Sequence, residues 1–318
     1  MALKHADIIA KMTLEEKASL CDGLDYWHSQ PVERVGIKSF SLNDGPHGIR
    51  KKGDPGDTPK GETNLLKGVP AICFPTASAT ACSWDTDLLY KMGEALGEEC
   101  LKEKVSVLLG PGTNIKRSPL CGRNFEYMGE DPYLAAQTST HYIIGVQSKG
   151  VAATIKHFLG NNSSYDRDHI SNDMDERTMN EIYMPAFKSA VQVANTACVM
   201  SSYNLLNGIY TTHNYDLLTT HLRDRWGFKG TLMSDWGSTH DGLQAAIAGL
   251  DLEMASADNM SATNMKQFLQ EGKITEETID KKVRHILHTL YRFGFNSGDG
   301  RDNSIPLDDP VSDSTALQ

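Results

Sequence analysis

The sequence has 318 residues, of which 39% are hydrophobic and 23% are charged, and its formal net charge is −10 at pH 7. This length suits one large α/β domain with an ample buried core. The acidic balance, without a basic stripe, argues against a nucleic-acid partner, and no run of about 18 apolar residues is available to cross a membrane.

The N-terminal segment 1–17 predicts a helix rather than a secretion signal, because no apolar stretch follows its charges. Thr13 and Glu16 have the spacing of a capping box. The six cysteines form no CxxC pair, and their wide spacing predicts buried reduced thiols rather than a disulfide frame or a metal ribbon. We therefore expect a cytoplasmic protein.

Short β-rich runs alternate with amphipathic stretches along most of the chain. The predicted strands are Phe40–Asn43, Ile72–Phe74, Val105–Leu109, Ala152–His157, Ala197–Ser201, Thr231–Ser234 and Leu250–Glu253. The predicted helices are Asp87–Lys104, Tyr133–Ser148, Arg177–Val193, Tyr215–Arg225, His240–Ala248 and Glu276–Phe293.

Strands that alternate with helices predict parallel βαβ units, and seven units favour a closed barrel over an open sheet. We therefore predict the α/β class, with a (β/α)8 TIM-type barrel, regular or irregular, over residues 1–295. Residues 296–318 are rich in Asp, Ser, Gly and Pro, and predict a linker or a surface extension rather than a packed element.

Polar residues follow several of the predicted strands where each strand ends. They are Asn43-Asp44-Gly45, Lys156-His157, Ser201-Ser202-Tyr203-Asn204, Ser234-Asp235-Trp236 and Glu253. Single residues of this kind are usually helix caps or turn residues. Because a barrel gathers its strand ends on one face, five such ends predict a functional site there.

Asp235 follows the apolar run Thr231–Met233, so its carboxylate is expected at the barrel mouth, with Trp236 as an apolar wall for a sugar ring. Such a carboxylate can act as a nucleophile, a general base or a metal ligand. No HxH or DxD pair accompanies it, so the sequence predicts neither a metal nor a cofactor. Lys156 could form a Schiff base as in aldolases, but donation to substrate hydroxyls is the favoured interpretation.

Several segments together resemble the signature of glycoside hydrolase family 3 β-glucosidases, in family order from about residue 10 to residue 295. They are Asp44-Gly45-Pro46 with Gly48 and Arg50, the segment 110–126 with Glu130-Asp131-Pro132, Lys156-His157-Phe158, Asp175-Glu176-Arg177-Thr178, Ser201-Ser202-Tyr203-Asn204 and Ser234-Asp235-Trp236-Gly237. Each string is short, but the set at these spacings is specific. The Asp of the first motif resembles the glucosidases of the family more than its xylosidases.

The resemblance implies a retaining mechanism in which Asp235 is the nucleophile that forms a covalent glycosyl-enzyme intermediate on a β-glucoside. It also implies a set of residues that bind the sugar: Asp44, Arg50, Arg123, Lys156, His157, Tyr203 and Trp236. Arg123 could instead be a structural partner of Glu126 or Asp131. Tyr203 could orient Asp235 and keep it ionised through a hydrogen bond.

In the family the general acid/base is a Glu of an α/β domain that follows the barrel, and no residue here matches it. The resemblance therefore implies a C-terminal domain, in cis or as a separate chain. One alternative is a hexosaminidase-like enzyme whose acid is His169 beside Asp168, although the Gly-His-Gly signature of that branch is replaced by Gly160-Asn161-Asn162. Another is a sugar-binding or assembly module without turnover.

Overall fold

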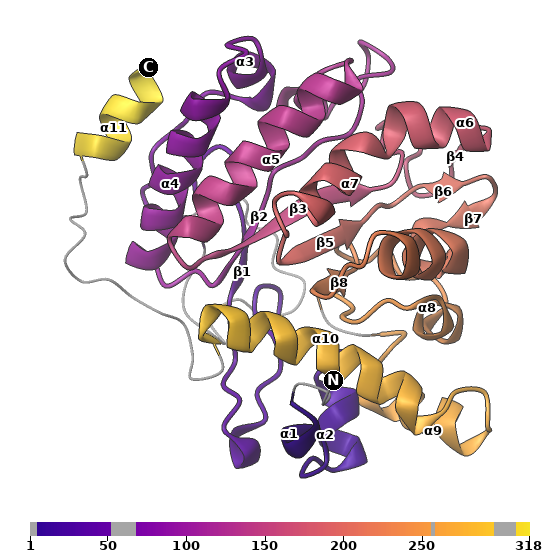
Figure 1. Cartoon of the computed structure of the whole chain (residues 1–318). Helices are drawn as coiled ribbons and strands as arrows, with labels where there is room; N and C mark the ends of the chain where they lie inside the picture. The colour runs from indigo at the N-terminus through magenta and orange to yellow at the C-terminus, as the bar shows by residue number, and fades with distance from the viewer. Residues whose placement is uncertain (1–4, 52–67, 256–257, 296–309) are drawn as a thin grey trace.

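The computed structural model describes residues 5–51, 68–255, 258–295 and 310–318 (Figure 1). Five parallel strands form the central sheet in the order β1-β2-β3-β5-β8. Their bounds are Leu42–Asp44, Val107–Leu109, Ala152–Phe158, Cys198–Ser201 and Thr231–Met233. All seven residues of β3 are buried, as expected for a parallel sheet that is covered on both faces.

Backbone pairing continues beyond β8 and leads back to β1. Leu252 bridges Met233 in parallel, and Glu253 bridges Asp22. The pairing then passes through antiparallel bridges between Gly23 and Ser29 and between His28 and Ser41, next to β1. The sheet thus closes as an irregular barrel, as predicted.

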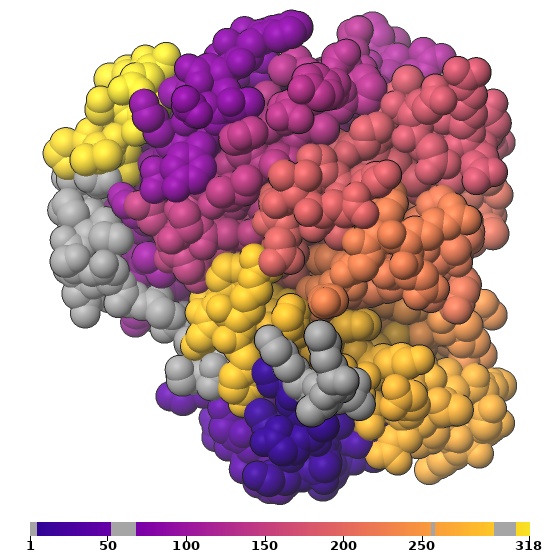
Figure 2. Space-filling view, in the orientation of Figure 1, coloured from indigo at the N-terminus to yellow at the C-terminus, as the bar shows by residue number. Residues whose placement is uncertain are grey.

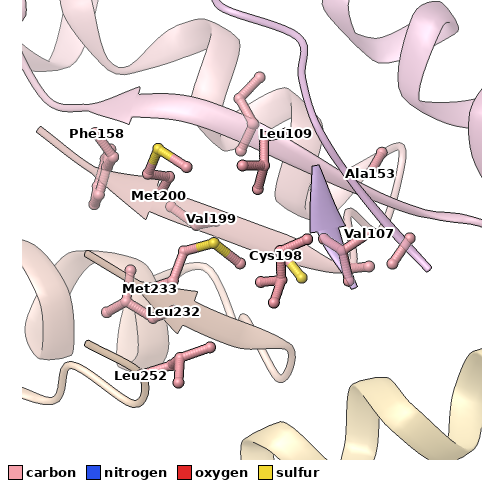
Figure 3. Close-up of a cluster of buried hydrophobic side chains, with 14 of the residues drawn as sticks. Val107, Leu109, Ala153, Phe158, Cys198, Val199, Met200, Leu232, Met233 and Leu252 are labelled. Atoms are coloured by element: carbon pink, nitrogen blue, oxygen red, sulfur yellow. The ribbon is translucent and has the colours of Figure 1, made fainter. Parts of the chain in front are cut away.

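The core of the barrel is apolar and fully buried. Figure 3 shows buried side chains of β2, β5 and β8 that belong to this core, among them Val107, Leu109, Met200 and Met233. Alternation of side-chain direction along each strand sends one set inward and the other toward the surrounding helices. Both sets are buried, and the polar residues Lys156 and His157 lie toward the carboxyl end of β3.

Helices cover the outside of the sheet, where α4 packs against α5 and α5 against α7 (Figure 1). The α-helices are α1 Ala6–Ile9, α2 Leu14–Ser19, α3 Ala77–Ala81, α4 Thr86–Lys102, α5 Pro132–Ser148, α6 Glu176–Thr178, α7 Pro185–Gln192, α8 Gly242–Ala248, α9 Ala262–Gln270, α10 Glu276–Phe293 and α11 Pro310–Leu317. The predicted capping box of Thr13 and Glu16 is present at the start of α2.

Short 3-10 and π-helical segments and a small second sheet complete the architecture. The 3-10 turns are η1 Glu33–Val35, η2 Asn124–Glu126 and η4 Thr211–His213, and the π-helical segments are η3 Met179–Tyr183 and η5 Asp216–Arg225. The small sheet joins β4 Ser171–Asn172, β6 Leu205–Leu206 and β7 Ile209–Tyr210 in the order β4-β6-β7.

Several predicted elements differ from the structure. Ile72–Phe74 forms no strand, and 250–253 pairs only through single bridges. The predicted helix 177–193 is divided into α6, η3 and α7, because Pro185 has no N–H to continue the ladder and therefore starts a new helix.

The tail also differs from its prediction. Residues 296–309 of the predicted linker lie outside the described part, whereas 310–317 forms α11, which lies against α4 (Figure 2). The residues of this helix are mostly small or polar, so the sequence has no apolar pattern there from which a helix could be predicted.

All six cysteines are free, but Cys73 and Cys82 are exposed, so the prediction of burial holds for only four. No helix within the described residues has the length and apolarity that crossing a bilayer would require.

Candidate active site

A cavity of about 520 Å³ opens at the carboxyl ends of the barrel strands. It is lined by all eight residues that the sequence analysis proposed for the site: Asp44, Arg50, Arg123, Lys156, His157, Tyr203, Asp235 and Trp236. These residues are far apart in the sequence, and the parallel sheet brings them together because successive strands end at the same edge.

Asp44 ends β1 and lies between two cations. Its Oδ1 accepts a hydrogen bond from Lys156 Nζ at 2.7 Å, and its Oδ2 accepts one from Arg50 Nη2 at 2.7 Å. Burial opposes ionisation of this carboxyl, but the charges of Lys156 and Arg50 outweigh burial and lower its pKa to about 2. Lys156 is therefore held as a hydrogen-bond donor, which favours sugar binding over Schiff-base chemistry.

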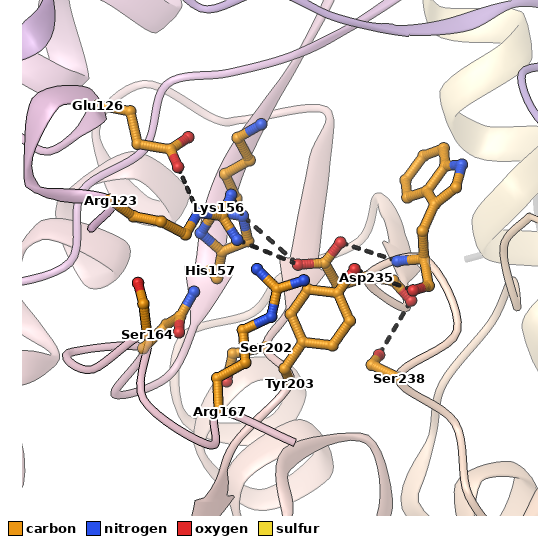
Figure 4. A network of polar contacts seen from close by, with 12 residues as sticks. Arg123, Glu126, Lys156, His157, Ser164, Arg167, Ser202, Tyr203, Asp235 and Ser238 are labelled. Atoms are coloured by element: carbon orange, nitrogen blue, oxygen red, sulfur yellow. Dashed lines mark hydrogen bonds and ion pairs between the residues drawn. The ribbon is translucent and has the colours of Figure 1, made fainter. Parts of the chain in front are cut away.

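Asp235 lies two residues beyond β8 and is only 6% exposed. Its Oδ1 accepts a hydrogen bond from Trp236 N at 2.8 Å, whereas its Oδ2 is buried without a hydrogen-bond partner among the described residues. That oxygen lies 3.5 Å from His157 Nε2 and 3.9 Å from Arg123 Nη1 (Figure 4). Burial raises the pKa of Asp235, and Arg123 and Lys156 oppose this shift.

Arg123 connects the loop after β2 to β3. Its Nε donates to the buried Glu126, and its Nη2 lies 2.8 Å from His157 Nε2. Burial disfavours its positive charge, but Tyr127, Glu126 and Asp235 raise its pKa. Arg123 therefore pairs with Glu126, as a structural residue would, and also lies beside Asp235 in the site.

Tyr203 and Trp236 form one wall of the cavity together with aromatic residues near the N-terminus. The Tyr203 hydroxyl donates to the carbonyl of Trp236 at 2.9 Å, and Trp236 Nε1 donates to the carbonyl of Tyr26 at 2.8 Å. The Trp27 ring lies 5.8 Å from the Trp236 ring. This wall presents apolar ring faces beside a polar group of residues, an arrangement that suits a ligand with both kinds of surface.

Some residues that line the cavity were not singled out from the sequence. They are Tyr26, Trp27, His47, Phe125, Glu126 and Arg167, apart from small and aliphatic neighbours. Arg167 stacks on the Tyr203 ring, with 4.1 Å between its Cζ and the ring centroid. Arg167 lies in the loop after β3, where no local pattern marks it, whereas the adjacent aromatic pair Tyr26-Trp27 offered a signal.

Other residues considered from the sequence lie outside the cavity. The carboxylate of Glu253, at a predicted strand end, accepts hydrogen bonds from the backbone N–H groups of Asn259 and Met260. The His169 side chain is 71% exposed and pairs with Asp166 at 2.8 Å rather than with Asp168. Neither His169 nor Asp168 lines the cavity, so the geometry gives no support to His169 as an acid.

Within the described residues, no group of three or more His, Cys, Asp or Glu side chains is arranged to hold a metal ion. The cavity instead combines paired charges, one carboxylate oxygen without a hydrogen bond and an aromatic wall. Charged acceptors and donors of this kind bind the hydroxyls of a sugar, and the aromatic faces pack against its C–H surface. The fold and the site thus define a barrel with one cavity at its strand ends, where paired charges and an aromatic wall surround the side chain of Asp235.

Comparison with known proteins identifies the family. Residues 56–289 match the glycosyl hydrolase family 3 N terminal domain. The chain is 47% identical over 291 residues to thermostable beta-glucosidase B of Acetivibrio thermocellus, covering 92% of this chain and 38% of that protein. It is 46% identical over 279 residues to an exo-alpha-(1->6)-L-arabinopyranosidase of Bifidobacterium breve, covering 88% of this chain and 36% of that protein.

A solved structure shows the same architecture. Beta-glucosidase 3B of Thermotoga neapolitana, in complex with alpha-D-glucose, superposes with a TM-score of 0.88 at 35% identity, covering 98% of this chain and 46% of that one. The chain therefore belongs to glycosyl hydrolase family 3 and comprises the N-terminal domain of that family. It spans less than half the length of these relatives.

Proposed function

We propose that this chain carries the sugar-binding residues and the nucleophile of a retaining β-glucosidase. The observation that carries the proposal is Asp235, whose side chain lines the cavity at the strand ends and whose buried Oδ2 has no hydrogen-bond partner among the described residues. An oxygen held by hydrogen bonds would have to lose them before attack, whereas Asp235 Oδ2 has none to lose to these residues. The names of the relatives support glucosides as the substrate class.

The proposed reaction has two steps. Asp235 Oδ2 forms a bond to the anomeric carbon while the bond from that carbon to the leaving oxygen breaks, and the leaving oxygen takes a proton from a general acid. Water then attacks the glycosyl ester, gives up a proton to the same group acting as a base, and regenerates the carboxylate.

The remaining residues of the site would bind the sugar. Asp44 accepts hydrogen bonds from hydroxyls, and Lys156 and Arg50 donate to them from positions that Asp44 already fixes. Arg123, His157 and Tyr203 surround Asp235, and Trp236 packs against the ring. One relative is named for an L-arabinopyranoside, a sugar that lacks the hydroxymethyl group on C5 of glucose and has the opposite configuration at C4, so we expect this set to accept pyranosides that differ from glucose at these two positions.

We further propose that the general acid/base comes from outside the described residues, in a C-terminal domain or a partner chain. Of the carboxyl groups in the described part of the chain, Asp44, Glu126 and Asp235 line the cavity. Asp44 has a pKa of about 2 and carries no proton at neutral pH. Glu126 is bound to Arg123, and Asp235 is the nucleophile. A general acid must carry a proton at the working pH, and none of these three carboxyl groups fits.

The test compares leaving groups with and without azide. The chain should release dinitrophenolate from 2,4-dinitrophenyl β-glucoside, because this leaving group needs no proton, and should cleave phenyl β-glucoside about 10²- to 10⁴-fold more slowly. Azide needs no base to attack the intermediate, so it should accelerate turnover and give β-glucosyl azide.

The control variants separate the nucleophile from other carboxylates. Asp235→Asn should abolish dinitrophenolate release, and Asp224→Asn, which changes an exposed carboxylate, should retain it. An α-configured azide product, or wild-type release by Asp235→Asn, would show that the proposal is wrong.

A further inference from the structure

Tyr127 is a fully buried tyrosine directly after η2, and it does not line the cavity. Its hydroxyl lies 3.1 Å from His157 Nδ1 and accepts a hydrogen bond from Asn161 Nδ2 at 3.0 Å. A buried hydroxyl in contact with a residue of the site can act on the site without touching the ligand.

The contacts of His157 determine which of its nitrogens carries the proton. Arg123 Nη2 lies 2.8 Å from His157 Nε2, and a guanidinium nitrogen can only donate. Nε2 must therefore accept. A neutral imidazole has one N–H, which is then on Nδ1 and donates to the Tyr127 oxygen.

The surroundings of His157 keep it neutral and fixed. Burial lowers the pKa of His157 well below its ordinary value, and the charges of Arg123 and Lys156 lower it further. Asn114 holds its backbone through two hydrogen bonds of 2.8 Å, one to the carbonyl and one from the N–H. The ring therefore offers Arg123 a lone pair at a fixed position and adds no charge beside Asp235.

This arrangement leaves one guanidinium nitrogen for the site. Arg123 Nε is bound to Glu126 and Nη2 to His157, while Nη1 lies 3.9 Å from Asp235 Oδ2. We propose that Tyr127 is a positioning residue: it accepts the N–H that Arg123 leaves on His157 Nδ1, and so supports the tautomer and the ring position in which His157 directs Arg123 toward the attacking oxygen of Asp235. The part of this inference that concerns Asp235 rests on the proposed function. The tautomer of His157 does not depend on it.

The test is Tyr127→Phe in the full chain, measured in two ways. Long-range ¹H–¹⁵N spectra of protein labelled at histidine, with His157 assigned by its loss in His157→Gln, should show the Nδ1–H tautomer in the wild type. In Tyr127→Phe, a population with N–H on Nε2 should appear. The rate of covalent labelling by 2-deoxy-2-fluoro-β-glucosyl fluoride should fall about ten-fold, the lower end of the effect seen when an outer hydrogen-bond partner of a metal-site residue is removed.

A matched control is Tyr142→Phe. Tyr142 is another fully buried tyrosine, and its hydroxyl donates to the carbonyl of Pro46 at 3.0 Å. Its variant should have a similar loss of stability but the wild-type His157 spectrum and labelling rate. This comparison separates positioning from a general loss of packing.

Each outcome bears on a defined part of the inference. The Nε2–H tautomer in the wild type, or an unchanged spectrum and rate in Tyr127→Phe, would overturn it. Labelling that never occurs on Asp235, together with the expected spectra, would overturn the proposed function and the catalytic purpose of the network, while the tautomer assignment would stand.

Discussion

At the scale of residues, the site holds two aspartates in opposite environments. Asp44 is bound by Lys156 and Arg50, and its pKa falls to about 2. Asp235 has one oxygen that accepts no hydrogen bond from the described residues, and burial raises its pKa. Environments that push the pKa values of two carboxyls apart suit them to different tasks, and we propose a fixed acceptor of hydrogen bonds for Asp44 and the nucleophile for Asp235.

The low pKa of Asp44 predicts a pH-dependent contribution to stability. Its pKa in the folded state is about 2 against an ordinary value of 3.8, so the contribution is complete above pH 4 and disappears as the pH falls toward 2. Asp44→Asn should therefore lower the free energy of unfolding by about 2 kcal/mol at pH 7, and by much less at pH 2.5. Urea unfolding at both pH values measures this.

The exposed carboxylate of Asp224 offers the comparison. Asp224→Asn should leave the free energy of unfolding nearly unchanged at both pH values. A stability difference between the wild type and Asp44→Asn that stays constant from pH 7 to pH 2.5 would contradict the assigned pairing.

The sequence predicted which residues gather at the site better than it predicted the full lining of the cavity. All eight proposed residues line one cavity, because they lie at the carboxyl ends of parallel strands or in the loops that follow them. Arg167 and the pair Tyr26-Trp27 were missed, since they reach the cavity from loops whose course depends on tertiary contacts. The role of Tyr127 could not be predicted either, because it depends on which nitrogen of His157 faces Arg123.

At the scale of elements, α4 and α5 approach each other closely through two glycines. A Cβ atom built on Gly145 would lie 2.1 Å from the carbonyl oxygen of Tyr90, and one on Gly93 would lie 2.4 Å from that of Tyr142. Both neighbours are backbone atoms, which cannot turn away as a side chain can. The helices cross at this distance only because both positions lack a side chain.

Gly145→Ala should therefore separate α4 from α5 and lower the free energy of unfolding by about 1–3 kcal/mol, the usual cost of overpacking. Thermal unfolding followed by circular dichroism measures it. Gly129→Ala is the control, since its Cβ would have neighbours no closer than 3.9 Å. Equal melting temperatures for the two variants would show that the helices can move apart freely.

The predicted elements were most accurate where the local pattern was strong. The helix Glu276–Phe293 has its predicted bounds, because an apolar stripe lies between a capping box at Thr275 and a left-handed Gly294. The segment 250–253 was harder to predict correctly, since its residues are buried in the barrel but pair with their neighbours only through single bridges. Irregular pairing depends on how the strands of the barrel meet when it closes, and a local sequence pattern does not predict this.

At the scale of the whole molecule, the barrel gathers the ends of its strands into one cavity while its helices cover the outside. The family assignment agrees with this architecture. The relatives extend well beyond the matched region, which supports the proposal that a further domain or chain completes the pocket with a proton donor. The barrel alone should then carry out the first step on activated substrates only.

The most direct test of the central claim is to locate the covalent intermediate. The chain is incubated with 2,4-dinitrophenyl 2-deoxy-2-fluoro-β-glucoside, whose leaving group needs no acid, and peptides are then mapped by mass spectrometry. We predict one fluoroglucosyl group, attached to Asp235 and absent from Asp235→Asn. A label on any other residue of the wild type, or a label that persists in Asp235→Asn, would contradict the assignment of the nucleophile.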